Sequence, residues 1–139
     1  MRRIWPLLLV MFVAMASFAK DDCTRVEYQN HNMIDYGPLM VPSIMGVAED
    51  KSKVAVPDVC IVLFTDDAAH KRVGMTTTDV DGNYALPVVP DGKYRLVAAL
   101  DPLCVANVPV VVKHKARKRP VAIVLQPRGL DSCSYGEYR

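Results

Sequence analysis

The sequence predicts an all-β protein, a seven-stranded antiparallel Greek-key sandwich with an extended N-terminal arm. From about residue 43 onward, short runs rich in Val, Ile, Thr and Tyr are separated by Pro, Gly and Asp turn signals. Strands prefer these residue types. Several runs alternate apolar and polar positions, which is typical of an antiparallel strand with one buried face. No window of useful length has the 3.6-residue apolar period of a helix, so we expect two packed sheets.

The first 19 residues have the pattern of a secretory signal peptide. The chain begins with two arginines, continues through the apolar run "LLLVMFVA", and reaches the small residues Ser17 and Ala19. A basic start, a short apolar core and small residues at the cleavage site are the features of such a peptide. The apolar run is short for a transmembrane helix, although an uncleaved N-terminal anchor is the alternative. We therefore expect a secreted or periplasmic protein with no membrane span after signal removal.

The mature chain, residues 20–139, would have 120 residues, enough for one domain with a real core. Removing Arg2 and Arg3 from the 17 Lys and Arg leaves 15, against 15 Asp and Glu. The mature protein is formally neutral, so its overall charge gives no reason to expect a nucleic-acid partner.

Residues 20–42 have little periodicity but too many apolar residues for simple disorder. We expect them to form an extended arm that lies on the sandwich. The strand expected over 58–65 gives a reason, because its outward positions Cys60, Val62 and Phe64 are apolar as well. That face needs a cover, and the arm is the nearest candidate.

The sandwich is expected over residues 43–127, followed by a C-terminal tail over 128–139. Its strands are expected at 44–49, 58–65, 73–78, 83–88, 93–100, 107–113 and 119–126. The clearest inward faces are Val59, Ile61 and Leu63, then Tyr94, Leu96, Ala98 and Leu100, then Val121, Ile123 and Leu125. Pro109 lacks an N–H for the ladder, which predicts that its strand is at a sheet edge or bulged there.

The run "TDVDGNY" looks like a cation-binding loop, because Asp79, Asp81 and Asn83 occupy alternate positions. An EF-hand loop would need Gly after Asn83 and an acidic residue six positions further on. Tyr84 stands in place of the Gly, and no acid occupies the later position. The run is better interpreted as an Asp-Gly hairpin turn, a device that "PDGKY" repeats between the next two strands. We expect no metal and no cofactor.

All four cysteines lie in the mature part, and an even count in an exported chain predicts two disulfides. Cys23 belongs to the arm and Cys60 faces outward beneath it, which favours a Cys23–Cys60 bridge. Cys104 enters the sixth strand and Cys133 lies just past the seventh, which favours Cys104–Cys133 if those strands form a hairpin. A Cys60–Cys104 bridge is also compatible, because all four cysteines lie towards one end.

The central sequence resembles a known family. "GVAEDKSKVAVPDVCIVLFTDD" and "VGMTTTDVDGNYALPVVPDGKYRLVAAL", with the final "VAIVLQP", resemble the carboxypeptidase regulatory-like domain. That domain is a transthyretin-like seven-stranded sandwich related to the Cna protein B-type repeats, and the resemblance covers about residues 43–127. It implies a structural or binding accessory, since the fold itself does not specify a function.

The motifs that give relatives a covalent or catalytic function are missing from the matching positions. The first expected strand has no Lys and the last has no Asn, so the internal isopeptide of some Cna-B-like domains is not expected. The tail "SCSYGEYR" is unlike the "YRGS"-type ending of the related hydrolases of 5-hydroxyisourate. The serines of the mature loops have no histidine near them in sequence to act as a base.

We therefore expect no enzymatic activity and a non-enzymatic exported binding or structural accessory module of the cell envelope. The alternative is a transthyretin-type small-molecule carrier or hydrolase. The oligomeric state is left open.

The run "KHKARKR" at 113–119 is the strongest candidate for a binding surface. It is either a solvated loop with charges that block aggregation, or a site for an anionic protein, polysaccharide or lipid headgroup. If successive strands alternate in direction, the loops 65–72, 89–93 and 113–119 meet at one end of the sandwich, the basic end.

The basic end would carry nine cations, counting flanking strand residues, against three acids, a net charge of +6. The opposite, acidic end would carry eight acids against four cations, a net charge of −4. The predicted anion-binding residues are Lys71, Arg72, Lys113, His114, Lys115, Arg117, Lys118 and Arg119. A protein or polysaccharide partner at the envelope is expected there.

Overall fold

The structure, a computed structural model, describes residues 23–29, 37–128, 133 and 137–138. The predicted signal peptide lies outside these residues. The elements are the 3₁₀ helix η1 (Cys23–Arg25) and nine strands: β1 (Leu39–Val41), β2 (Met45–Glu49), β3 (Cys60–Thr65), β4 (Arg72–Thr77), β5 (Asn83–Ala85), β6 (Gly92–Ala99), β7 (Ala106–Val112), β8 (Val121–Val124) and β9 (Glu137–Tyr138). Among the described residues, no helix has the length and apolar character needed to cross a membrane.

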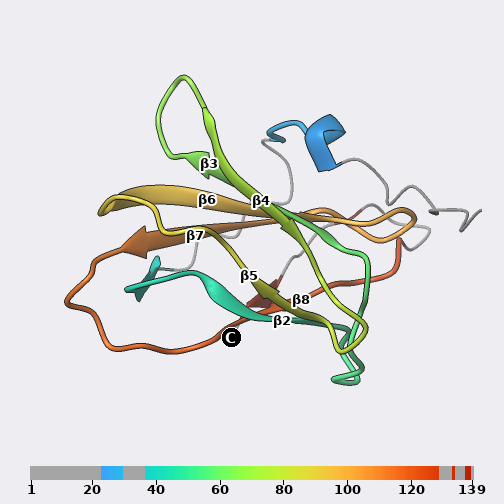
Figure 1. Ribbon diagram of the computed structural model, residues 1–139. Helices are drawn as coiled ribbons and strands as arrows, with labels where there is room; N and C mark the ends of the chain where they lie inside the picture. Colours follow the sequence, from blue (N-terminus) through green and yellow to red (C-terminus); the bar gives the residue numbers. More distant parts are fainter. Residues whose placement is uncertain (1–22, 30–36, 129–132, 134–136, 139) are drawn as a thin grey trace, which may run out of the picture.

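The strands form two facing sheets, so the protein is an all-β sandwich (Figure 1). One sheet has the order β1-β7-β6-β3-β4 and the other has the order β5-β2-β8-β9. Each of the seven predicted strands overlaps one observed strand, β2 to β8. The two additional strands are β1, within the expected arm, and β9, within the expected tail.

The prediction of a purely antiparallel sandwich is wrong at two pairings. β1 pairs with β7 in parallel, and β2 pairs with β8 in parallel, while the other ladders are antiparallel. The pairings within each sheet fit a chain that reverses its direction at every step from β1 to β8. Strands six steps apart in such a chain run the same way, so β1–β7 and β2–β8 must be parallel.

The Asp-Gly turn is present, but it is not a hairpin, because β4 and β5 belong to different sheets. Asp79 Oδ1 accepts hydrogen bonds from the N–H groups of Asp81 and Asn83, each at 2.9 Å. Gly82 has a φ of 74°, which glycine adopts at little cost. The "PDGKY" run does not repeat this device: its Gly92 begins β6 and pairs with Val112.

The core lies between the sheets and contains the predicted inward faces of β3, β6 and β8. Its largest fully buried side chains include Ile61, Leu63, Leu96, Ile123 and Leu125. Burying each such side chain contributes about 1.5–3 kcal/mol.

The prediction that the strand of Pro109 is an edge strand or bulged is wrong, since β7 lies between β1 and β6 and pairs with β6 without a register shift. The Lys113 N–H donates to Val41 O of the β1 side, so by alternation the nitrogen of Pro109 faces the same side. β1 begins only opposite Val110. The missing N–H therefore lies where the neighbouring strand has not yet started, and no ladder bond is lost.

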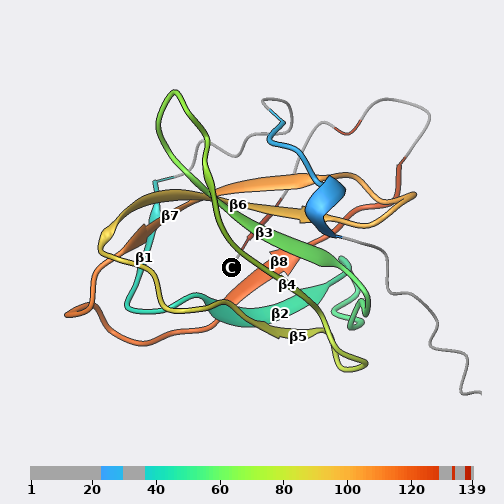
Figure 2. The same ribbon diagram turned by 45° about the horizontal axis from the view of Figure 1, so that its top comes forward.

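The outer face of the larger sheet is covered as the sequence predicts. Cys60, Val62 and Phe64 form a second apolar cluster with Val97 of β6 and with arm residues, including Val26 and Tyr28. η1 lies against β3 and β4 (Figure 2). The Cys23–Cys60 disulfide closes this contact.

The second disulfide joins Cys104 to Cys133, also as expected, although β7 and β8 do not form a hairpin. The alternation of strand direction places the start of β7 beside the end of β8. The Cys104 N–H donates to Gln126 O at 2.9 Å there.

The Tyr84 hydroxyl ties the two neighbours of β2 together. It is buried and donates to Val121 O at 2.7 Å. A Tyr84→Phe variant should lose about 1 kcal/mol of unfolding free energy in urea denaturation. Burial raises the pKa of Tyr84 above its ordinary 10.0, so wild-type stability is retained below pH 10 and falls as the pH rises further. The variant should fall less steeply above pH 10; an unchanged slope would contradict this account.

Candidate anion-binding tip

Two loops form a compact tip at one end of the sandwich, which we call the basic tip: residues 89–93 before and at the start of β6, and residues 113–119 after β7. The antiparallel β6–β7 ladder brings them together by pairing Gly92 with Val112. The His114 N–H then donates to Asp91 Oδ1 at 3.1 Å, and the His114 ring Nδ1 contacts the same oxygen. The Ala116 N–H donates to Lys113 O at 2.9 Å, which folds the start of the second loop into a turn.

The basic tip carries a high density of exposed positive charge. Its six cations are exposed: Lys93, Lys113, Lys115, Arg117, Lys118 and Arg119. Asp91 is the one acid in the two loops, so the net charge is +5. Within the described part of the chain, none of the six cations forms an ion pair. The one acid of the two loops, Asp91, is paired with His114 instead.

Asp91 remains ionised beside these cations. Partial desolvation raises its pKa, but the hydrogen bonds from the His114 side chain and backbone, with the nearby charges of His114 and Lys113, outweigh this effect and lower the pKa below its ordinary 3.8. The carboxylate is thus already bonded within the tip. It organises the loop pair and leaves the surrounding ammonium and guanidinium groups available.

The tip is hollowed rather than flat. A depression of about 520 Å³ is lined by Asp91, Gly92, Lys93, Val111, Val112, Lys113, His114 and Lys115. Valines supply apolar surface and lysines supply cations around it. This arrangement suits a ligand that carries negative charge on an otherwise apolar or carbohydrate frame.

The structure separates two of the predicted cations from the tip. Arg72 is half-buried on the outer face of the larger sheet, where it donates to Val26 O and its guanidinium carbon lies 5.8 Å from the Phe64 ring centre. It holds the arm in place. Lys71 is exposed, but it lies on the β3–β4 loop, which projects away from the basic tip in both ribbon views (Figures 1 and 2).

Arg95 also leaves the predicted charge cluster, because it is buried. The +6 expected from sequence therefore overstates the exposed charge of the loops. Asp91 and Lys93 were not among the predicted anion-binding residues, but they do line the tip. Lys93 directly precedes Tyr94, and neighbouring side chains of a strand point to opposite faces. The inward Tyr94 was therefore the sequence signal that could have placed Lys93 outward.

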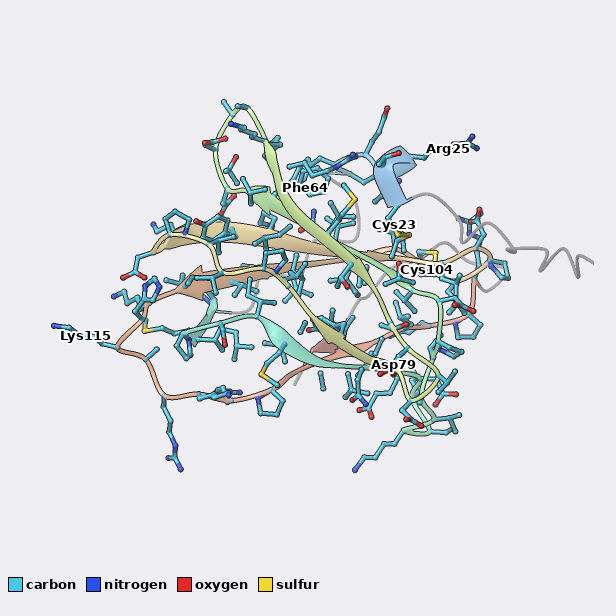
Figure 3. The ribbon with its side chains drawn as sticks, in the orientation of Figure 1. Cys23, Arg25, Phe64, Asp79, Cys104 and Lys115 are labelled. Atoms are coloured by element: carbon cyan, nitrogen blue, oxygen red, sulfur yellow. A yellow bond between two sulfur atoms is a disulfide. The ribbon has the colours of Figure 1, made fainter. Side chains whose placement is uncertain are left out.

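The basic tip and the turn of Asp79 lie at opposite ends of the sandwich, as Lys115 and Asp79 show (Figure 3). Around that turn, Asp79 is engaged with backbone N–H groups rather than with a cation. In the described ranges, no group of three His, Cys, Asp or Glu side chains is arranged to hold a metal ion.

No protein-family model matches the chain, and no curated protein matches it either. Among solved structures, 5-hydroxyisourate hydrolase of Klebsiella pneumoniae aligns over 71% of this chain and 97% of its own, with 13% identity and a TM-score of 0.51. The 3-chlorocatechol 1,2-dioxygenase of Rhodococcus opacus aligns over 81% of this chain and 66% of its own, with 11% identity and a TM-score of 0.40. The first likeness concerns architecture alone, and together with the two sheets it identifies the fold as a transthyretin-like β-sandwich.

Proposed function

We propose that the protein is a non-enzymatic, exported accessory module of the cell envelope that binds an anionic protein or polysaccharide through the basic tip. The observation that supports it most is the imbalance of charge: six exposed cations surround one acid, which His114 already engages. Clustered charges of one sign raise the local concentration of oppositely charged ligands and speed their association.

Two further features support this role. The motifs of residues 43–127 are similar to those of the carboxypeptidase regulatory-like domain, whose members are mostly accessories. The two disulfides favour an oxidising, extracellular setting, which fits the signal-like N-terminus and a secreted or periplasmic location.

The rival proposal is a transthyretin-type small-molecule carrier or hydrolase, which the fold of the Klebsiella enzyme suggests. Two histidines are already engaged: His70 stacks on Tyr28 at 3.6 Å, and His114 contacts Asp91. We therefore rank this proposal second. Turnover of 5-hydroxyisourate by the purified chain would support it and contradict the accessory role.

The test of the anion-binding role removes three cations from the second loop. A Lys115→Gln/Arg117→Gln/Lys118→Gln variant should keep its stability, because exposed charges contribute roughly 0–1 kcal/mol each. Each cation contributes about 1 kcal/mol to binding an anionic membrane surface. Loss of three should weaken binding to heparin or anionic vesicles roughly a hundredfold.

The matched control is Lys51→Gln/Lys53→Gln/Arg128→Gln, which removes three exposed cations remote from the basic tip. It has the same net charge as the test variant, so a non-local electrostatic effect would weaken both equally. We expect wild type and control to be retained at low salt and released as salt rises. Equal elution of all three proteins would show that the cations of the basic tip are only solvated and do not bind the anionic matrix.

A further inference from the structure

Among the described strands, β4 is the only long one at a sheet edge. The strand orders place β1, β4, β5 and β9 at the four edges of the two sheets. β1 and β5 have three residues each and β9 has two, whereas β4 has six. A very short edge strand offers little backbone to another chain, and a long edge strand is normally protected by charges or proline.

The edge of β4 lacks these protections. Residues 73–77 are Val-Gly-Met-Thr-Thr, with no charge and no proline. Arg72 precedes them, but its guanidinium is held over the outer face of the sheet, where it donates to Val26 O and lies over the Phe64 ring. The bulge at the start of the strand leaves Gly74–Thr77 in regular register with β3. This part of the edge therefore has the form that another strand can join.

Two residues of the edge present backbone groups for such a strand. The Thr78 N–H donates to Val59 O on the β3 side at 3.0 Å. Because the backbone groups of successive strand residues point to opposite sides, those of Thr77 and Met75 point away from β3. Among the described residues, no backbone group outside the β3–β4 ladder reaches them. The Met75 side chain, 37% exposed, adds apolar surface beside them.

We propose that a second copy of this chain pairs with the edge, β4 against β4, in antiparallel orientation about a two-fold axis. With Met75 opposite Thr77 of the second copy, the two residues exchange both N–H···O bonds, and the symmetry repeats the exchange. The larger sheets of the two copies then form one continuous sheet. No residue of the basic tip takes part, so the proposal is independent of the proposed function.

Charge complementarity favours a second copy over an unrelated strand. Lys71 lies just before β4, and Asp79 and Asp81 lie in the turn just after it; all three are exposed. The β3–β4 loop and the turn of Asp79 are at opposite ends of the strand (Figure 3). Antiparallel pairing brings the start of one β4 beside the end of the other. Each Lys71 therefore comes beside the acidic turn of the second copy, and the attraction occurs twice.

The dimer should be weak, because one pair of strands buries less area than the standard interface of about 1,600 Å². Sedimentation of the purified chain from micromolar to millimolar concentration measures its dissociation constant. Amide hydrogen exchange over the same range identifies the contact. We expect exchange at Met75 and Thr77 to slow as the concentration rises. Ala85 is the internal control: it lies on the β5 edge, and its amide should exchange at the same rate throughout.

Three variants test the pairing at exposed positions. Met75→Lys places a charge on the edge and should weaken the dimer at least about tenfold. Lys71→Glu turns both attractions into repulsions and should weaken it about tenfold. Lys71→Glu/Asp81→Lys restores opposite charges, so its dimer should be close to wild type. The control is Lys118→Glu, which has the same net charge as Lys71→Glu but changes the basic tip, and it should dimerise like wild type.

A protein that stays monomeric at every concentration would overturn the proposal and leave the edge to a strand of another protein. A dimer in which the amides of Met75 and Thr77 exchange as fast as in the monomer would also overturn it, because another face would make the contact. Equal weakening by Lys71→Glu and Lys118→Glu, without recovery in the charge-swapped variant, would contradict the antiparallel register. None of these outcomes bears on heparin binding by the basic tip.

Discussion

A Gly46→Ala variant should lose about 3 kcal/mol or more of unfolding free energy, at the upper end of what overpacking costs. β2 and β8 approach so closely at the Gly46–Val121 pairing that an alanine Cβ would lie 1.9 Å from Val121 O and 2.6 Å from its carbonyl carbon. Both are backbone atoms, which cannot rotate away as a side chain can. The two strands would have to separate, and Gly46 also pairs with Tyr84 of β5.

Urea denaturation of Gly46→Ala should be compared with Gly74→Ala, another glycine in a strand. A Cβ at Gly74 would meet its nearest atom, Pro87 Cδ, at 3.6 Å, which is ordinary contact. We expect Gly74→Ala to stay within about 1 kcal/mol of wild type. Equal losses from the two substitutions would show that the β2–β8 approach does not control stability.

Removal of the Cys23–Cys60 disulfide should have an effect of comparable size. The bridge spans 37 residues, so the chain-entropy model assigns it about 4 kcal/mol, within the usual range of about 2–4. A Cys23→Ala/Cys60→Ala variant should therefore unfold at much lower urea. It should also free the arm, whose other contacts include a small apolar cluster, the stacking of Tyr28 on His70 and the hydrogen bonds to Val26 and Gln29.

Freeing of the arm can be distinguished from general destabilisation by limited trypsin digestion under native conditions. Arg25 lies in η1, two residues after Cys23. Cleavage after Arg25 should be fast in Cys23→Ala/Cys60→Ala and slow in Cys104→Ala/Cys133→Ala, which loses a bridge of comparable span at 29 residues. Equal cleavage in both variants would mean that the disulfide does not hold the arm.

Much of the sandwich could be predicted from the sequence, because each main strand carries its own signal. The apolar runs that form β3, β6 and β8 are a local property of the sequence, and so is the Asp79–Gly82 turn. β1 and β9 have three and two residues, too short for alternation to be recognised. They are strands only because β7 and β8 offer partners distant in sequence.

The assignment of strands to sheets could not be predicted in this way. Both Asp-Gly runs read as hairpins, yet each connects one sheet with the other. A turn sequence specifies a local change of direction and not which neighbour the next strand pairs with. Alternating direction was enough, however, to place residues 89–93 and 113–119 together at one end.

Arg72 and Arg95 show what sequence reasoning missed at the candidate site. Their side chains flank the same loops as the exposed cations, so a charge count includes them. Burial depends on the arm, whose residues Val26 and Gln29 bond to Arg72 and to Asn107 beside Arg95. Such contacts between segments about 46 and 78 residues apart leave no local pattern.

The central claim, that the basic tip is an anion-binding surface, is tested most directly by titrating the isotopically labelled protein with a heparin-derived hexasaccharide. We predict saturable amide shifts concentrated in residues 91–93 and 113–119, which shrink as added salt shortens the Debye length from about 10 Å at 0.1 M. Residues 79–83, at the opposite end, should not shift. Shifts that are absent from the basic tip, or that are equal at both ends of the sandwich, would contradict the account.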